Sequence, residues 1–175
     1  MIDLAPVTEA RLPLLVAAAL AGAAADDVTP PVSPGPQWTG ERVEWLQAFH
    51  RDRREGLAGP GQESTWAVVD VGDDSGPEGG QVVGGVRLQR TSDPQVLETG
   101  IWLVRDARGR GVGRQALQLV LERARQVGAA TVRARTTAGN KGALGLLRSL
   151  GAVVTADGDV VRAEIPLQRA DPGPR

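Results

Sequence analysis

The chain has 175 residues and 41% hydrophobic content, which is enough to bury one substantial core and favours a single domain. Its formal net charge is −1, so no global basic field attracts nucleic acid or an anionic membrane, and we expect neither as a partner. Cysteine is absent and His50 is the only histidine, which excludes disulfides and thiolate catalysis and makes a metal site implausible.

An apolar run over residues 12–25 follows a short strand predicted at residues 1–5. The run is similar to the apolar region of a signal peptide, so export is the alternative to a cytoplasmic location. The residues before the run argue against export, because they contain two acidic residues, Asp3 and Glu9, and one arginine, and so lack the positive charge of a signal peptide. The run is also too short to span a bilayer, since it has 14 residues and a span needs ~20. We therefore expect a first helix, capped near Thr8 and packed on a sheet, in a cytoplasmic protein.

The next segments predict a loop, a helix and a β-hairpin. Residues 26–37 are rich in proline and indicate a loop. Thr39 is the expected N-cap of a helix that runs to about residue 57, with Trp38 and Val43 at the staple positions. Two β-branched runs, residues 65–71 and 81–88, flank the glycine-rich residues 72–80, which predicts a hairpin with a mobile tip.

The C-terminal half alternates strands and helices. Strands are predicted at residues 96–104 and 131–136, and a helix at residues 115–127. A further helix begins at Asn140, as N-cap, and ends at Gly151, whose position suits a positive φ. A final hairpin joins residues 153–156 to residues 160–167, and residues 168–175 indicate a flexible tail. This order predicts one mixed α/β domain over residues 1–167.

Residues 108–114, Arg-Gly-Arg-Gly-Val-Gly-Arg, lie between the predicted strand and helix and are called the glycine loop below. Its glycines allow positive φ and a close approach to a ligand, and the first turn of the following helix presents unpaired N–H groups. Its cationic side chains are those of Arg108, Arg110 and Arg114. These features predict a phosphate-binding site. The spacing fits neither G-x-G-x-x-G nor a P-loop, and a glycine-rich turn without a ligand is the alternative.

Arg108, Gly111 and Gly113 match the pattern Gln/Arg-x-x-Gly-x-Gly/Ala, through which the chain resembles the GNAT N-acetyltransferase superfamily. Residues 140–152 are similar to the family's second segment, which starts with Asn-x-x-Ala/Ser and continues as a helix. The resemblance implies a mixed, mostly antiparallel sheet of about six to seven strands flanked by about four helices. It also implies an acyltransferase with acetyl-CoA as cosubstrate.

The resemblance further assigns the contacts to acetyl-CoA. A bulged strand end would supply a backbone N–H to the thioester carbonyl, the glycine loop would hold the pyrophosphate, and Asn140 would touch the pantetheine arm. The residues so assigned are Leu103, Val104, Arg105, Arg108, Gly109, Arg110, Gly111, Val112, Gly113, Arg114 and Asn140. Ala152 departs from the family's usual aromatic, and Leu147 stands where many members carry a tyrosine general acid, so another group or water must act as the acid.

Glu98 is the candidate general base. It lies in an otherwise apolar strand on the same face as Gly100 and Trp102, where burial would make its carboxylate a stronger base. The resemblance supports this role, because the family often places a glutamate base on this strand. An ion pair with Arg87 or another arginine of the neighbouring strand is the alternative.

Trp38, His50 and Trp102 are the candidates for binding the acceptor. Trp45 and Phe49 recur at helical spacing, which indicates either ordinary core or the wall of a pocket. For His50, a packed or solvated side chain is the alternative to a contact with substrate.

A small-molecule amine is the expected acceptor, acetylated by direct transfer in a ternary complex. A protein or peptide α-amine is the alternative, since residues 99–103 are similar to the branch that includes ribosomal-protein N-terminal acetyltransferases. A noncatalytic acyl-CoA sensor is the alternative of another class. The sequence does not name the acceptor or the acyl-chain range, and it leaves the oligomeric state, a homodimer included, open.

Overall fold

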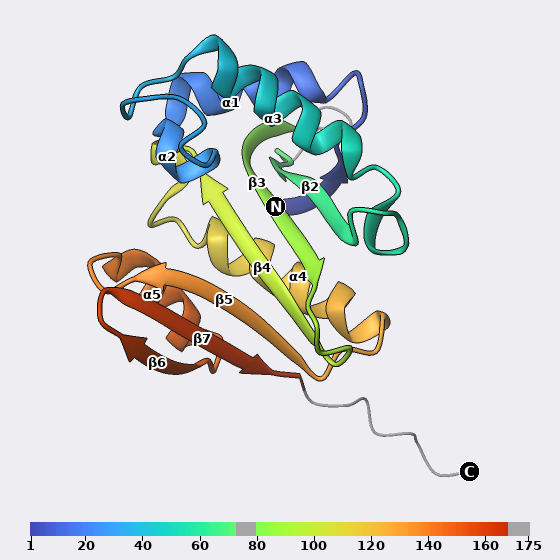
Figure 1. Ribbon diagram of the computed structural model, residues 1–175, viewed down its shortest axis with the longest axis vertical. Coiled ribbons are helices and arrows are strands. Elements are labelled where there is room, and N and C mark those ends of the chain that lie inside the picture. The colour runs from blue at the N-terminus through green and yellow to red at the C-terminus, as the bar shows by residue number, and fades with distance from the viewer. Residues whose placement is uncertain (73–79, 168–175) are drawn as a thin grey trace.

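The computed structural model describes residues 1–72 and 80–167 of the chain. The described residues form a seven-stranded sheet in the order β1-β2-β3-β4-β5-β7-β6 (Figure 1). Its strands are β1 (Ile2–Pro6), β2 (Glu63–Asp70), β3 (Gln81–Arg90), β4 (Val96–Leu103), β5 (Thr131–Thr137), β6 (Val153–Asp157) and β7 (Val160–Pro166). Among these strands β4 and β5 pair in parallel and the other neighbours pair antiparallel, so the expected mixed, mostly antiparallel sheet is confirmed.

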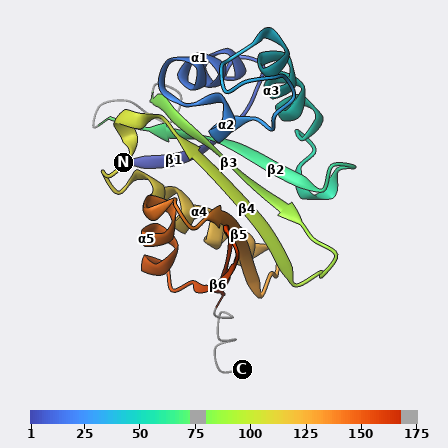
Figure 2. The same cartoon turned by 60° about the vertical axis from the view of Figure 1, so that its left-hand side comes forward.

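Helices cover both faces of the sheet (Figure 2). On one side lie α1 (Leu12–Gly22), α2 (Ala25–Val28) and α3 (Gly40–Asp52), and on the other lie α4 (Val112–Gln126) and α5 (Lys141–Ser149). Two 3-10 turns, η1 (Gly56–Ala58) and η2 (Arg105–Ala107), follow α3 and β4. None of the described helices is long and apolar enough to cross a membrane.

Two apolar cores lie on the two faces because strand side chains alternate between them. On the α1 and α3 side, Leu12, Leu15 and Leu46 pack with the strand residues Ala67 and Val69. The second core joins α4 and α5 to the opposite face, through buried residues that include Ala116, Leu117, Val120, Leu147, Leu88, Leu97 and Val132. Burial of these side chains is the main stabilising contribution to the fold.

The sheet splits between β4 and β5. The two strands pair only from Val96 to Thr99 on β4, against Thr131 to Ala134 on β5, although β4 continues to Leu103 and β5 to Thr137. Beyond this short ladder the strands diverge (Figure 1). The split lies beside the start of α4 and opens the sheet at the end of β4.

Local capping signals are confirmed. The Thr39 side chain accepts a hydrogen bond from the Arg42 backbone N–H at 3.3 Å, and Asn140 accepts one from the Ala143 N–H at 3.1 Å. Gly151 follows α5 with a φ of +80°, a conformation that favours glycine.

Three boundary predictions were wrong. Helix α3 ends at Asp52 instead of near residue 57, because Gly56 takes a φ of +68° and the chain turns into η1. The predicted loop over residues 26–37 begins inside α2, which is the helix beyond the expected four, and α4 begins three residues before the predicted start. The hairpin tip falls mostly on residues 73–79, and the tail on residues 168–175, both outside the described residues.

A buried arginine holds the segment between α2 and α3. The Arg42 guanidinium is almost fully buried and donates to Asp26 Oδ1 at 2.8 Å, to Thr29 Oγ1 at 3.0 Å and to the Gly35 carbonyl at 2.9 Å. A buried charge is tolerable when it is paired and hydrogen-bonded in this way. The contacts fix α2 against α3 and so place the neighbouring Asp27.

Candidate functional site

Two of the three loop glycines have the positive φ that the sequence predicts, and the third, Gly113, lies inside α4. Gly109 and Gly111 take φ values of +73° and +79°, and a Cβ at either position would meet no atom within 4 Å. Gly111 is the N-cap of α4 and supplies no side-chain cap, and the first α4 amide bonded to the helix is that of Gln115, which donates to the Gly111 carbonyl at 3.1 Å. The preceding amides therefore face an open, electropositive helix start that suits an anion.

The three loop arginines differ in their contacts. Arg114 lines the cleft beside the loop, whereas Arg110 is exposed and donates to the Asp106 carbonyl at 3.5 Å. Arg108 donates from Nε to the Leu103 carbonyl at 3.0 Å and from Nη2 to Asp27 Oδ2 at 2.9 Å. The Arg108 side chain thus ties the loop to α2, and its guanidinium is not free to serve an anion alone.

A cleft of about 470 Å³ runs from the end of β4 over the glycine loop to α5. Seven of the residues assigned to acetyl-CoA line it, namely Leu103, Arg108, Gly109, Gly111, Gly113, Arg114 and Asn140. It is also lined by residues that sequence reasoning missed in this role, among them Asp27, Ile101 and Leu146. We call this hollow the loop cleft.

Four assigned residues do not line the loop cleft: Val104, Arg105, Arg110 and Val112. The Val104 N–H donates to the Val83 carbonyl at 2.9 Å, and the Val112 side chain is buried in the α4 core. The bulge expected near residues 103–105 is absent from the β3–β4 pairing, which is regular through Leu103. A register shift instead interrupts the β2–β3 pairing, between Val68 and Val69.

A second hollow of about 440 Å³, called the acceptor cavity below, lies on the α3 side of the sheet. The rings of Trp45, Phe49 and Trp102 line it together with polar side chains from α3, β2 and β3. Asp27, Ile101 and Trp102 line both hollows. The loop cleft and the acceptor cavity therefore adjoin at the end of β4.

Of the three residues predicted to bind the acceptor, two line the acceptor cavity and one does not. His50 and Trp102 line the acceptor cavity, but Trp38 does not, because its Nε1 donates to the Ala23 carbonyl at 3.0 Å and its ring packs against the α1 core. Trp45 and Phe49 stack with ring centroids 4.9 Å apart. Of the two roles that their helical spacing allowed, core or pocket wall, the structure shows the wall of the acceptor cavity.

His50 is buried, with 3% of its surface exposed. Its Nδ1 lies 3.0 Å from Thr65 Oγ1. Burial lowers the pKa of His50 to about 4, and the nearby positive charge of Arg53 acts in the same direction. The imidazole is therefore neutral at neutral pH.

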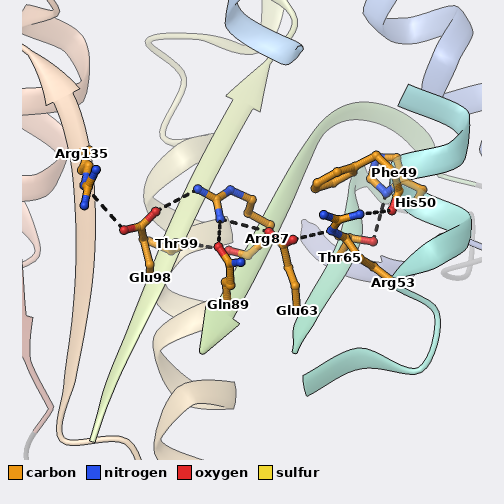
Figure 3. Close-up of polar contacts among 10 residues, drawn as sticks. All are labelled: Phe49, His50, Arg53, Glu63, Thr65, Arg87, Gln89, Glu98, Thr99 and Arg135. Carbon is orange, nitrogen blue, oxygen red and sulfur yellow. Dashed lines mark hydrogen bonds and ion pairs between the residues drawn. The ribbon is translucent and has the colours of Figure 1, made fainter. Parts of the chain in front are cut away.

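A chain of ion pairs crosses the sheet from the end of α3 to β5 (Figure 3). Glu63 is 2% exposed and its carboxylate binds Arg53 on one side and Arg87 Nη1, at 3.0 Å, on the other. Arg87 Nη2 binds Glu98 Oε1 at 3.1 Å, and Arg135 lies 3.6 Å from Glu98 Oε2. We call these five residues the ion-pair chain.

Glu98, the candidate base, lies within this chain. It makes the ion pair with Arg87 that was the alternative to a catalytic role, and it is not among the residues that line the acceptor cavity. Its two carboxylate oxygens each face an arginine, Arg87 for Oε1 and Arg135 for Oε2. The catalytic assignment of Glu98 stays a prediction.

Two strand glycines make room for the side chains of the site. Gly85 pairs with Trp102 and Gly100 pairs with Arg87 across the β3–β4 ladder. A Cβ at Gly85 would lie 2.6 Å from Trp102 Nε1, and one at Gly100 would lie 2.9 Å from Arg87 Nε. The Trp102 indole and the Arg87 guanidinium therefore lie directly against the backbone of Gly85 and Gly100. A glycine inside a predicted strand is the sequence feature that can indicate such a close approach.

The structure thus combines a split sheet, a glycine loop at a helix start and two adjoining hollows. Residues 2–153 match the family described as acetyltransferase (GNAT) domain, and the chain belongs to this family of acetyltransferases. No curated protein matches the chain in sequence.

Solved structures share the fold at low sequence identity. The GNAT domain of S. lividans PAT has a TM-score of 0.69 and 18% identity, over 95% of this chain and 89% of that chain. Spermidine N-acetyltransferase from Vibrio cholerae, solved with CoA and spermine, has a TM-score of 0.67 and 16% identity, over 95% of each chain. The Salmonella typhimurium protein yncA, solved with its cofactor acetyl-CoA, has a TM-score of 0.66 and 16% identity, over 98% of this chain and 95% of that chain.

Proposed function

We propose that this protein is an N-acetyltransferase that moves an acetyl group from acetyl-CoA directly to the primary amine of a small molecule. The observation that carries the proposal is the meeting of the loop cleft and the acceptor cavity at Ile101 and Trp102. Two adjoining hollows allow both substrates to be bound together, which direct transfer needs.

The loop cleft fits acetyl-CoA. Open space above Gly109 and Gly111, and the amides at the start of α4, suit a pyrophosphate, to which Arg114 adds a positive charge. Asn140 lines the same cleft at the start of α5, although its side chain also caps that helix. The CoA and acetyl-CoA named with the Vibrio and Salmonella proteins support this assignment.

The end of β4 supplies the donor for the thioester carbonyl. Because the Val104 N–H bonds to β3, the alternation of an antiparallel ladder turns the Leu103 N–H away from β3 and towards the split. We assign Leu103 as this donor, in place of Val104, and a fixed amide aimed at the developing oxyanion is a large catalytic contribution.

The transfer itself is a nucleophilic substitution at the thioester. The neutral amine nitrogen forms a bond to the carbonyl carbon, the C–S bond breaks, and its electron pair leaves with sulfur. The proton released by the nitrogen balances the thiolate as the free thiol of CoA. No covalent enzyme intermediate is proposed, because the chain has no cysteine. The amine proton leaves through water, because Glu98, the candidate base, is held in ion pairs and does not line the cavity.

Calorimetry with acetyl-CoA and a thiol-release assay over an amine panel test the proposal. We expect binding, and thiol release that depends on both acetyl-CoA and an amine. Binding without thiol release for any small amine would refute the proposed function and favour the sensor. Acetylation of peptide N-termini, with no turnover of small amines, would instead favour the branch that acts on ribosomal proteins.

A further inference from the structure

Two guanidinium groups meet at one buried carboxylate on the wall of the acceptor cavity. Arg53 and Arg87 both bind Glu63, and all three side chains line the cavity. Within the described part of the chain, the other carboxylate that lines the cavity is that of Asp27, which Arg108 already neutralises. The neutral His50 adds no charge. An ammonium group in this cavity would find no unpaired carboxylate, whereas an anion would find the guanidinium groups of Arg53 and Arg87.

Donors for such an anion remain available. Arg87 uses Nη1 and Nη2 for its partners, and Arg53 uses Nε and Nη1. Among the described residues, Arg87 Nε and Arg53 Nη2 have no hydrogen-bond acceptor. Both side chains are partly exposed, at 32% and 25%, and both line the cavity. Glu63 and Glu98 hold the two guanidinium groups in place, which lowers the entropic cost of binding.

The cavity also has apolar lining, and the Arg53 guanidinium lies 3.9 Å from the centroid of the Phe49 ring. Trp45 and Phe49 stack from α3, and Trp102 lies across Gly85 on the sheet. An occupant therefore needs an anionic end for the arginines and an apolar part for the rings. Its amine must reach the junction with the loop cleft at Trp102.

We propose that the acceptor is a small primary amine that also carries a carboxylate, of the apolar amino-acid class, with its carboxylate bound by Arg53 and Arg87. This inference rests on the proposed function and narrows its substrate. It separates this chain from the spermidine acetyltransferase whose fold it shares, because a polyamine carries several positive charges and no anion.

Matched acceptors test the proposal on the unmodified protein. We compare kcat/KM for L-phenylalanine, L-phenylalaninamide, 2-phenylethylamine and spermidine, each corrected for its neutral amine fraction. A carboxylate bound by charged donors should favour phenylalanine over its amide by about 10- to 100-fold. Equal or better turnover of the amide, the phenylethylamine or spermidine would overturn the inference and leave the proposed function intact. Thiol release with no amine at all would refute both.

Variants locate the carboxylate. Arg87→Gln and Arg53→Gln should each reduce the acid-to-amide ratio of kcat/KM by about tenfold or more, whereas activity on the amide should change less. Arg90→Gln, on the same strand but outside the cavity lining, is the matched control and should keep the ratio. Because either arginine also supports buried Glu63, circular dichroism checks that each variant is folded. A ratio unchanged in both folded variants would overturn the assignment.

Discussion

At the scale of single residues, three positions have surroundings that restrict their backbone conformation, their protonation or their contacts. Gly111 has a positive φ over open space, His50 is buried beside a cation, and Glu98 is held by two arginines. For each of the three residues, one substitution should change a measurable property, namely ligand affinity, turnover or stability.

Gly111→Asp should weaken acetyl-CoA binding at least tenfold, because it adds a side chain and a negative charge where we propose that the pyrophosphate binds. Calorimetry measures the affinity. Gly128→Asp is the matched control, because Gly128 also has a positive φ, +81°, and open space around it, and lies beyond the other end of α4. Equal affinities in the folded Gly111 variant and the parent would contradict the loop assignment.

Glu98→Gln should reduce the free energy of unfolding by about 1 to 3 kcal/mol and leave turnover per folded molecule nearly intact, since its contacts are ion pairs. A denaturation curve and kcat across pH check both. The catalytic alternative predicts a different outcome: kcat lower by roughly 100-fold and loss of the acidic limb of the pH profile.

The buried neutral His50 should make the protein less stable in acid. Its pKa is about 4 in the folded state and 6.5 in the reference state, so between these values the unfolded chain binds more protons. Stability should fall as pH decreases from 6.5 towards 4, by about 3 kcal/mol in total. Denaturation curves at several pH values, for the parent and for His50→Gln, measure this.

The pH dependence of stability that comes from His50 can be separated from that of Glu9. The pKa of Glu9 is lowered to about 2 by hydrogen bonds from Arg51 and Arg54, so its contribution is lost mainly below its ordinary value of 4.5. The slope between pH 6.5 and 4.5 therefore reports on His50, and an identical slope in the variant would show that His50 is not buried in its neutral form.

At the scale of elements, the β3–β4 ladder positions the site by pairing a large side chain with a glycine twice. Trp102 lies over Gly85 and Arg87 lies over Gly100, so both side chains reach the acceptor cavity from the middle of the sheet. Any other residue in place of Gly85 or Gly100 would add a Cβ atom in the space that the Trp102 and Arg87 side chains occupy.

Gly85→Ala should displace the Trp102 indole and destabilise the protein by about 1 to 3 kcal/mol, because the added Cβ would lie 2.6 Å from a rigid ring. Urea denaturation and tryptophan fluorescence report the two effects. Gly145→Ala, in α5, is the contrast: its Cβ meets nothing within 4 Å, and it should stabilise by about 0.5 to 1 kcal/mol. Destabilisation of similar size in both variants would argue against the Trp102 contact.

At the scale of the whole molecule, the proposed anion sites depend on local charge and not on the net charge of the chain. The net charge is −1, yet the glycine loop and the ion-pair chain each present guanidinium groups on a split sheet. Strands β4 and β5 separate beyond their short ladder (Figure 1). The loop cleft begins at this end of β4 and adjoins the acceptor cavity on the α3 side.

Binding of acetyl-CoA should therefore weaken as salt increases, because its contacts are phosphate-directed and partly exposed. Calorimetry at 50 and 500 mM NaCl, concentrations that bracket a Debye length of about 10 Å, measures the change. An affinity independent of salt would indicate that the adenine and pantetheine parts, and not the phosphates, dominate binding.

Local patterns in the sequence were sufficient for much of the fold. Thr39 and Asn140 cap helices, Gly111 turns the chain, and the two hairpins follow from β-branched runs. These features depend on near neighbours in the chain, so the residues alone determine them. The glycine loop belongs to this group, because its backbone and its helix start lie within seven residues.

The acceptor cavity was decided by the tertiary structure. Glu63, Arg87 and Asp27 come from three separate elements, and no local spacing relates them. Sequence alternation could place Glu98 and Arg87 on neighbouring strands but could not choose between a base and an ion pair, because that choice depends on Arg135 and Glu63 as well. Side-chain roles that arise from contacts between distant segments follow only from the packing of the sheet and helices.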